Sequence, residues 1–297
     1  MCIHISTYVN NKPTLPFLET MITQVCNISC EGCTNYSDLP HKGYTRWEDG
    51  KKTLEQWLEV IEIPDFGIMG GEPLINPQVY DWIYGVRDLL PDSQIRFTTN
   101  GLLLHKKKFK NIMRVMHDIG NVVFKITVHI NNDVVQGFID DTLSEYDWAE
   151  VNEFGIKRLK SSNNVRLQLN YPSSFVKPFK NDYSNMQPYN SNPSDAFAQC
   201  IQQTCPLLYN GKIYKCSTSA LLKDTLQRFG MPHLDLWEGY ISDGISHNDN
   251  IDIINNFISN FGSSHRMCGQ CPSINDSSSA IIHDESTIIS KLHVYIR

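Results

Sequence analysis

The chain has 297 residues, a length that fits one large domain or two smaller ones. Its apolar fraction of 41% can fill a sizeable core, and its net charge of −6 gives no basic footprint, so nucleic acid is not favoured as a partner. The sequence shows no apolar run of the ~18 residues that a membrane span needs and no signal-peptide pattern, so we expect a cytoplasmic protein with no membrane partner. In that reducing compartment, nine cysteines favour metal binding over disulfides.

Apolar runs and helical periodicity alternate along the chain as far as residue 170. Strands are predicted at residues 17–23, 66–69, 94–98, 122–129 and 165–169, and helices around 54–61, 79–90, 109–116 and 134–139. This order predicts an α/β fold with a parallel sheet and right-handed crossovers, either doubly wound or an open, partial barrel. Residues 170–196 lack a clean period and predict a linker or a loop over the substrate, and the sixth strand has no assigned position.

Three cysteines follow the first predicted strand at short spacing. Cys26, Cys30 and Cys33 form C-x3-C-x2-C within the stretch QVCNISCEGCTNY. Thiolate ligands select iron–sulfur clusters, zinc or copper(I) over hard ions. Because a four-iron cluster usually takes four cysteines, three leave one iron free to bind another molecule. A structural zinc site is the competing interpretation of this spacing.

Two glycine-containing motifs end neighbouring predicted strands. MGGEP closes the run at 66–69, and TTNG, at residues 98–101, closes the run at 94–98. The carboxyl ends of parallel strands form the edge where α/β proteins bind ligands. Together with the three cysteines, these motifs favour an iron–sulfur site over zinc.

The C-x3-C-x2-C spacing followed by GGEP at Gly70–Pro73 resembles the radical S-adenosylmethionine (SAM) superfamily. The resemblance implies a partial (β/α)6 TIM-like barrel whose 4Fe–4S cluster binds the amino and carboxylate groups of SAM at its open iron. It also implies that the reduced cluster cleaves SAM to methionine and a 5′-deoxyadenosyl radical, which takes a hydrogen atom from the substrate. An electron donor such as flavodoxin or ferredoxin is the expected partner.

Under this resemblance the strand ends supply the cofactor contacts. We expect SAM or substrate contacts from Gly70, Gly71, Glu72, Thr99, Asn100, His129 and Asn170. The superfamily usually has an aromatic residue before its third cysteine; Gly32 stands there, and Tyr36 is the expected substitute beside the adenine. Plain turns at the glycines and rim polar groups without function are the structural alternatives. No catalytic base can be named.

The last third of the chain holds a second set of cysteines. Asn210-Gly211 between apolar runs predicts a hairpin that brings the two cysteines flanking it towards each other. A C-x2-C pair follows later. Four thiolates are thus available to close a second iron–sulfur cluster or a zinc site: Cys205, Cys216, Cys268 and Cys271. Cys200 is either a free thiol or a replacement for one of the four.

C-x10-C followed by C-x2-C resembles the twitch and SPASM extensions of radical SAM enzymes. The resemblance implies a radical SAM core over residues 1–190 and a small twitch-like domain with a β-hairpin and an auxiliary 4Fe–4S cluster over residues 191–297. The motifs from 24 to 271 also resemble a radical SAM group linked with glycan or capsule biosynthesis. The expected function is therefore a radical SAM oxidoreductase that acts on a small, sugar-derived molecule, with the auxiliary cluster assisting oxidation or substrate placement.

Two other functions remain open at this point. Peptide-modifying radical SAM maturases often carry a leader-binding domain of ~80 residues, and the 16 residues before the first predicted strand are too few for one. The alternative from a different class is a zinc-stabilised binding protein that performs no catalysis.

Overall fold

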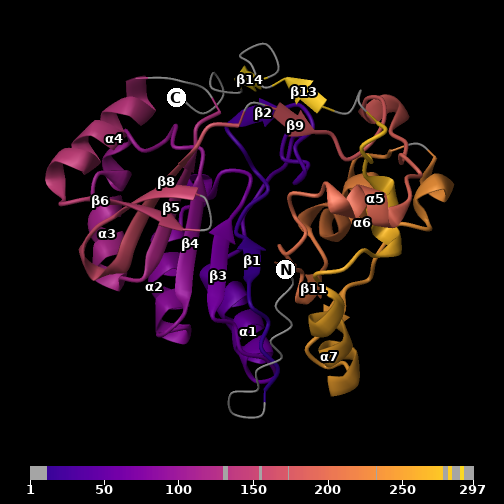
Figure 1. The fold of residues 1–297 in the computed structure, drawn as a ribbon, viewed down its shortest axis with the longest axis horizontal. Helices are drawn as coiled ribbons and strands as arrows, with labels where there is room; N and C mark the ends of the chain where they lie inside the picture. The colour runs from indigo at the N-terminus through magenta and orange to yellow at the C-terminus, as the bar shows by residue number, and fades with distance from the viewer. Residues whose placement is uncertain are drawn as a thin grey trace.

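The computed structural model describes residues 12–129, 133–153, 156–172, 174–231, 233–276, 280–282 and 288–290. Its centre is a ten-stranded sheet in the order β12-β11-β10-β1-β3-β4-β5-β8-β7-β6 (Figure 1). The strands of this sheet are β1 (Leu18–Met21), β3 (Asp65–Met69), β4 (Gln94–Thr99), β5 (Val122–Thr127), β6 (Ala149–Glu153), β7 (Ile156–Lys160), β8 (Val165–Asn170), β10 (Leu207–Tyr209), β11 (Lys212–Tyr214) and β12 (Ile245–Ser246).

Five parallel neighbours, β1-β3-β4-β5-β8, form the core that the sequence predicts. The helices that alternate with them are α1 (Trp47–Leu58), α2 (Val79–Leu89), α3 (Ile112–Ile119) and α4 (Asp133–Glu145). Alternate strand residues, among them Phe97 and Phe124 with ring centroids 5.7 Å apart, join Trp57 of α1 and Trp82 of α2 in one buried core. The fold is mixed α/β, and the sheet does not close into a barrel.

The sixth parallel strand comes from beyond the predicted linker. β10 pairs with β1, with Leu207 opposite Glu19, so the sheet continues across the predicted boundary between residues 190 and 191. At the other edge, sequence reasoning missed the hairpin β6–β7, which runs antiparallel to β8. The segment 170–196 is irregular except for β9 (Ser174–Val176), a 3-10 turn at Tyr183–Asn185, and α5 (Pro193–Ala198).

The predicted hairpin of the last third is confirmed. Asn210 and Gly211, with φ of 49° and 80°, make the two-residue turn between β10 and β11. The indole of Trp57 in α1 donates a hydrogen bond to the Gly211 carbonyl at 3.1 Å, which holds the turn against the core. Helices α6 (Ser217–Arg228) and α7 (Ile251–Asn260) complete this part, on the far side of β1 from α2–α4 (Figure 1).

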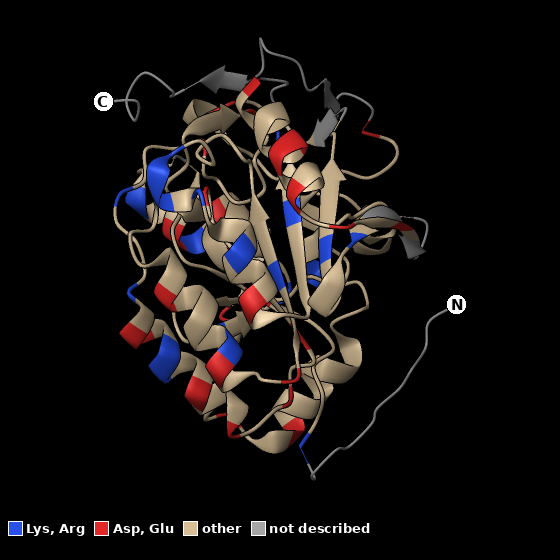
Figure 2. Cartoon of the chain, turned by 90° about the vertical axis from the view of Figure 1, so that its left-hand side faces the viewer, with Lys and Arg blue, Asp and Glu red and all other residues tan. Residues whose placement is uncertain are grey.

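Two short antiparallel ladders lie together at the top of Figure 1. They pair β2 (Ile28–Cys30) with β14 (Ile288–Ser290), and β9 with β13 (Ala280–Ile282). In the view of Figure 2, acidic and basic residues are interspersed over the helices. Among the described helices, none combines the length and the apolar character needed to cross a bilayer.

Candidate active site

A cavity of about 300 Å³ opens at the carboxyl ends of the parallel strands. Nine residues singled out from the sequence line it: Cys26, Cys30, Cys33, Gly70, Gly71, Thr99, Asn100, His129 and Cys205. Residues of two glycine motifs and of the cysteine loop thus meet at one edge of the sheet, although Cys26 and Asn100 are 74 positions apart in the sequence. Their roles toward SAM stay predictions, but their juxtaposition is a structural fact.

Cys26 and Cys30 lie beside polar side chains, and Cys33 lies near the Asp38 carboxylate. The Asn100 amide donates to Asn27 Oδ1 at 2.7 Å and lies 3.9 Å from Cys26 Sγ. The Sγ of Cys30 lies 4.0 Å from His129 Nδ1. Burial raises the pKa of the Cys33 thiol to about 11, and the nearby Asp38 carboxylate adds to that rise. The Cys33 thiol therefore stays protonated until it binds a metal group, which displaces its proton.

Gly70 and Gly71 pack against the backbone that leads into the cysteine loop. The Gly71 N–H donates to the Thr23 carbonyl at 2.8 Å. A Cβ built on Gly70 would lie 2.7 Å from the same carbonyl oxygen, and one on Gly71 would lie 2.5 Å from the Val25 oxygen. Glycine is thus required for this contact, which fixes the loop after β3 beside Cys26.

Glu72 lies behind the cavity rather than on its wall. Its fully buried carboxylate accepts hydrogen bonds from the Leu74 N–H, the Thr99 hydroxyl and the Asn100 N–H at 2.7–3.0 Å. Burial raises its pKa to about 7, and these three donors oppose the rise. The residue ties the loop after β3 to the loop after β4.

Two further predicted cofactor residues also lie off the cavity wall. Asn170 ends β8, where its carbonyl accepts from the Val128 N–H at 2.8 Å. The Tyr36 ring is fully buried and stacks on Phe179 with centroids 6.2 Å apart, in the second core cluster with Leu221 and other side chains. Its burial there directs Tyr36 toward the C-terminal part of the chain.

The floor of the cavity holds charged residues that sequence reasoning missed. Glu19 of β1 and Lys125 of β5 line it, together with Cys205. Burial raises the pKa of Glu19 to about 7, and the charges of Lys125 and Arg96 oppose the rise. Figure 2 shows Lys and Arg positions, in blue, on the central strands. The sequence could have indicated both residues, because Glu19 and Lys125 are single charges inside the buried strands LETM and VVFKIT. A charge buried in this way is costly unless it has a partner or a function.

Four thiols of the last third lie within electrostatic range of one another. They are Cys200, Cys216, Cys268 and Cys271. Besides burial, the charge of Cys268 raises the pKa of Cys200, the charges of Cys200 and Cys268 raise the pKa of Cys216, and the charges of these three raise the pKa of Cys271. Cys205 differs, since its strongest charged neighbour is Glu19 and it lines the cavity. These charged neighbours and the cavity lining favour Cys200 over Cys205 as the fourth member of the second set.

Backbone donors point at this second set. The Gln202 N–H donates to Cys200 Sγ at 3.3 Å, and the His265 N–H donates to Cys268 Sγ at 3.4 Å. Cys216 is the N-cap residue of α6 and its sulfur accepts from a backbone N–H of the first turn. Hydrogen bonds of this kind and a helix N-terminus favour thiolates.

Both sets have the donor chemistry of iron–sulfur ligation. In the described part of the chain, no three His, Cys, Asp or Glu side chains converge on the position of a single metal ion. A 4Fe–4S cluster is a larger group, held by thiolates around its periphery. Three thiols on the wall of an open cavity fit a cluster with one exposed iron, and four thiols within electrostatic range of one another fit a cluster with complete protein ligation.

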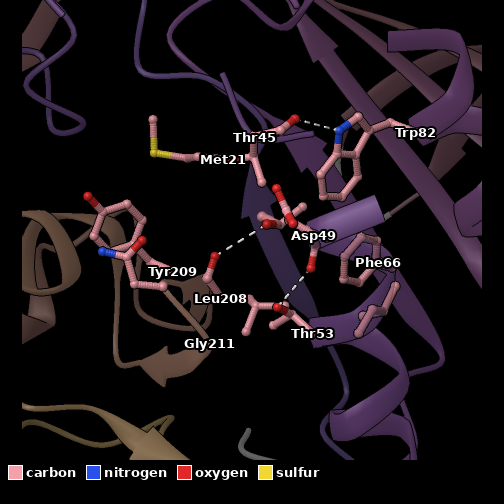
Figure 3. A pocket seen from close by; sticks show the side chains of 13 residues that line it. Met21, Thr45, Asp49, Thr53, Phe66, Trp82, Leu208, Tyr209 and Gly211 are labelled. Atoms are coloured by element: carbon pink, nitrogen blue, oxygen red, sulfur yellow. Dashed lines mark hydrogen bonds between the residues drawn. The ribbon is translucent and has the colours of Figure 1, made fainter. Parts of the chain in front are cut away.

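A second cavity, of about 230 Å³, lies on the opposite face of the sheet (Figure 3). Thr20 and Phe66 line it, and these alternate along their strands with Glu19 and Gly67, which face the other way. Asp49 and Thr53 of α1 and the β10–β11 turn complete its wall. Its described lining contains no thiol, so we place the chemistry in the first cavity.

Comparison with known proteins agrees with this assignment. The model of the Radical SAM superfamily matches residues 20–162. The chain is 30% identical over 100 residues to a GTP 3′,8-cyclase of Alkaliphilus metalliredigens, covering 31% of this chain and 30% of the relative. It is 27% identical over 171 residues to a GTP 3′,8-cyclase of Clostridium perfringens, covering 52% and 46%. It therefore spans less than half the length of these curated relatives.

Among solved structures, BtrN in complex with AdoMet and 2-DOIA matches with a TM-score of 0.48 at 16% identity, covering 88% of this chain and 94% of that one. SuiB of Streptococcus suis bound to S-adenosylmethionine matches with a TM-score of 0.32 at 18% identity, covering 39% and 26%. The superfamily's shared cofactors are a 4Fe–4S cluster and SAM. Residues 20–162 of this chain thus form a domain of the radical SAM superfamily.

Proposed function

We propose that this chain is a radical SAM enzyme that removes a hydrogen atom from a small-molecule substrate. The observation that carries the proposal is the convergence of Cys26, Cys30 and Cys33 with the glycine loop on a single cavity. Three thiols would hold a 4Fe–4S cluster there, and Cys200, Cys216, Cys268 and Cys271 would hold a second. When bound, these groups supply the electron that cleaves SAM and an acceptor for an electron released by the substrate.

The residues around the first three thiols would orient a bound SAM and enclose it. Gly70 and Gly71 present backbone to the cavity, and Glu72 fixes that loop to the Thr99–Asn100 turn. The buried Asn100 amide holds Asn27 and borders Cys26. This rigid wall would fix a bound SAM relative to the substrate and exclude water from a reactive radical.

Glu19 is the group that we propose to accept a proton. Loss of a hydrogen atom from a C–H bond beside a hydroxyl leaves a carbon-centred radical. That radical becomes a carbonyl when it releases one electron and the hydroxyl gives its proton to Glu19. The pKa of about 7 suits a carboxylate for this transfer, because a base works best with a pKa near the operating pH.

The charge of the cavity bears on the substrate class. Its described lining sets two carboxylates, Glu19 and Asp38, against one lysine, Lys125. Such a wall offers little positive charge for a triphosphate like that of the GTP named for the relatives. We therefore favour a substrate of low net charge that carries hydroxyl or amino groups, in line with the sugar-derived molecule expected from the sequence.

Anaerobically reconstituted, reduced protein tests the proposal. Incubated with SAM, it is expected to form 5′-deoxyadenosine, measured by mass spectrometry, well above a control in which Cys26, Cys30 and Cys33 are all alanine. Protein loaded with iron and sulfide that forms none of this product would overturn the enzyme assignment. Zinc at stoichiometric amounts in protein purified without oxygen would favour the non-catalytic alternative.

A further inference from the structure

One buried cation lies beside the second set of thiols. Lys215 is 3% exposed and directly precedes Cys216, the N-cap residue of α6. Its ammonium donates to the carbonyl of Gln203 at 2.7 Å and to the carbonyl of Phe261, and it lies 4.7 Å from the centre of the Phe197 ring. Three elements thus enclose this charge.

The ammonium has no carboxylate to balance it. Across the residues that the structure describes, no Asp or Glu makes an ion pair with Lys215. Carbonyl oxygens satisfy its N–H groups but carry no net charge. A buried charge costs several kcal/mol unless an opposite charge compensates it, so the fold calls for an anion here.

The groups that surround Lys215 identify that anion. Lys215 directly precedes Cys216, and its ammonium donates to the carbonyls of Gln203 and Phe261. Gln203 adjoins Gln202, whose N–H donates to Cys200 Sγ. Phe261 adjoins Asn260, whose carbonyl lies 3.2 Å from the ring of His265, the residue whose N–H donates to Cys268 Sγ. These sulfurs are neutral as thiols and anionic when they ligate a metal. The same sulfurs receive the backbone N–H groups described above, which also stabilise negative charge.

The buried hydroxyl of Tyr36 is a second hydrogen-bond donor that indicates an anionic group at this place. The Tyr36 hydroxyl is buried without a hydrogen-bond partner in the structure, and its charged neighbours include Cys271 and Cys216. A buried, unpartnered hydroxyl costs about 1–3 kcal/mol. It is explained if an acceptor such as a cluster sulfur fills the space that it faces.

We propose that Lys215 is the fixed counter-charge of an anionic metal–thiolate centre at Cys200, Cys216, Cys268 and Cys271, and that its ammonium raises the reduction potential of that centre. This inference rests on the second cluster of the proposed function. The potentials of iron–sulfur clusters follow net charge, hydrogen bonds to sulfur and solvent exposure. A positive charge stabilises the more negative, reduced state, so Lys215 makes the centre a better electron acceptor for substrate oxidation.

Redox titration followed by electron paramagnetic resonance tests this role. The starting protein lacks the first cluster through alanine at Cys26, Cys30 and Cys33, so that the second centre is observed alone. Lys215→Gln keeps an N–H donor for the two carbonyls and removes the charge. At a fixed potential the ratio of reduced to oxidised centre should fall at least tenfold, which is about 59 mV for one electron.

Two variants control this measurement. Lys215→Arg keeps the charge and should leave the ratio within about threefold of the parent. Lys223→Gln, in the helix α6 that follows Lys215, removes an exposed charge that lies 3.6 Å from Asp243, and should have no effect. If Lys215→Gln fails to assemble the centre while Lys215→Arg assembles it, with unchanged circular dichroism, the counter-charge role is supported.

The outcomes separate the two proposals. A second centre whose potential is unchanged in Lys215→Gln overturns the role of Lys215 and leaves the second cluster in place. Failure of both Lys215→Gln and Lys215→Arg to hold the centre shows a steric role and also overturns it. A wild-type protein that assembles one cluster overturns both this role and the second cluster, while SAM cleavage still tests the first.

Discussion

The two thiol sites of this chain differ in their number of thiols and in their charged neighbours. The first sets three thiols on the wall of an open cavity, with the Asn100 amide 3.9 Å from Cys26 Sγ and the Asp38 carboxylate near Cys33. The second sets Cys216, at the N-terminus of α6, within electrostatic range of Cys200, Cys268 and Cys271, and the buried ammonium of Lys215 lies beside it. An open site of this kind suits a group that must bind another molecule, whereas a charge-compensated site with four thiols suits a group that only exchanges electrons.

Removing the first site should have the largest effect. Replacement of Cys26, Cys30 and Cys33 by alanine should lower iron from about eight to about four per chain and cut SAM cleavage at least a thousandfold, to background. Iron analysis and 5′-deoxyadenosine formation measure both. Retained cleavage in this variant would break the distinction between the sites, because the second would then react with SAM.

Removing the second site should leave SAM cleavage largely intact. Cys216→Ala should lower iron to about four per chain, with cleavage in the absence of substrate within about tenfold of wild type. Cys205→Ala is the matched control, because Cys205 lines the cavity beside Glu19, and this variant should keep about eight irons. An iron loss in Cys205→Ala equal to that in Cys216→Ala would restore the ligand set expected from the sequence.

The wall of the first site should depend on Glu72. Glu72→Ala leaves the N–H groups of Leu74 and Asn100 buried without their acceptor and should lower the free energy of unfolding by about 3 kcal/mol. Urea denaturation compares it with Glu59→Ala, an exposed substitution expected to change stability by less than about 0.5 kcal/mol. Equal stabilities would mean that the loops after β3 and β4 are held without this carboxylate.

The smallest effect concerns the cavity floor and depends on pH. Folding raises the pKa of Glu19 from 4.5 to about 7, so the folded state favours the protonated acid. The stability of wild type relative to Glu19→Gln is therefore greatest below pH 4.5 and falls as pH rises through 7, by about 2 kcal/mol after a discount for partial exposure. Urea denaturation at several pH values measures this difference, and a pH-independent difference would contradict the assignment of Glu19 as a buried acid.

Sequence periodicity predicted the parallel core because each of its strands is an apolar run with a helix between it and the next. The hairpin β6–β7 was missed, since AEVNE and IKRLK are polar strands at an edge and carry no apolar run. The spacing of Cys26, Cys30 and Cys33 identified the first site because its ligands are local in sequence. Cys205 lies near Glu19 because β10, which follows Cys205 in the chain, pairs with β1. That pairing joins residues 188 positions apart, so local spacing could not decide between Cys200 and Cys205.

The account's central claim is that the first cluster leaves one iron open to SAM. The most direct measurement is electron–nuclear double resonance on reduced protein that carries SAM labelled with ¹⁵N in its amino group. We predict a nitrogen coupling in wild type that persists in Cys216→Ala, because SAM binds the iron that lacks a protein ligand. A cluster that shows no coupling to labelled SAM at saturating concentration would contradict the claim.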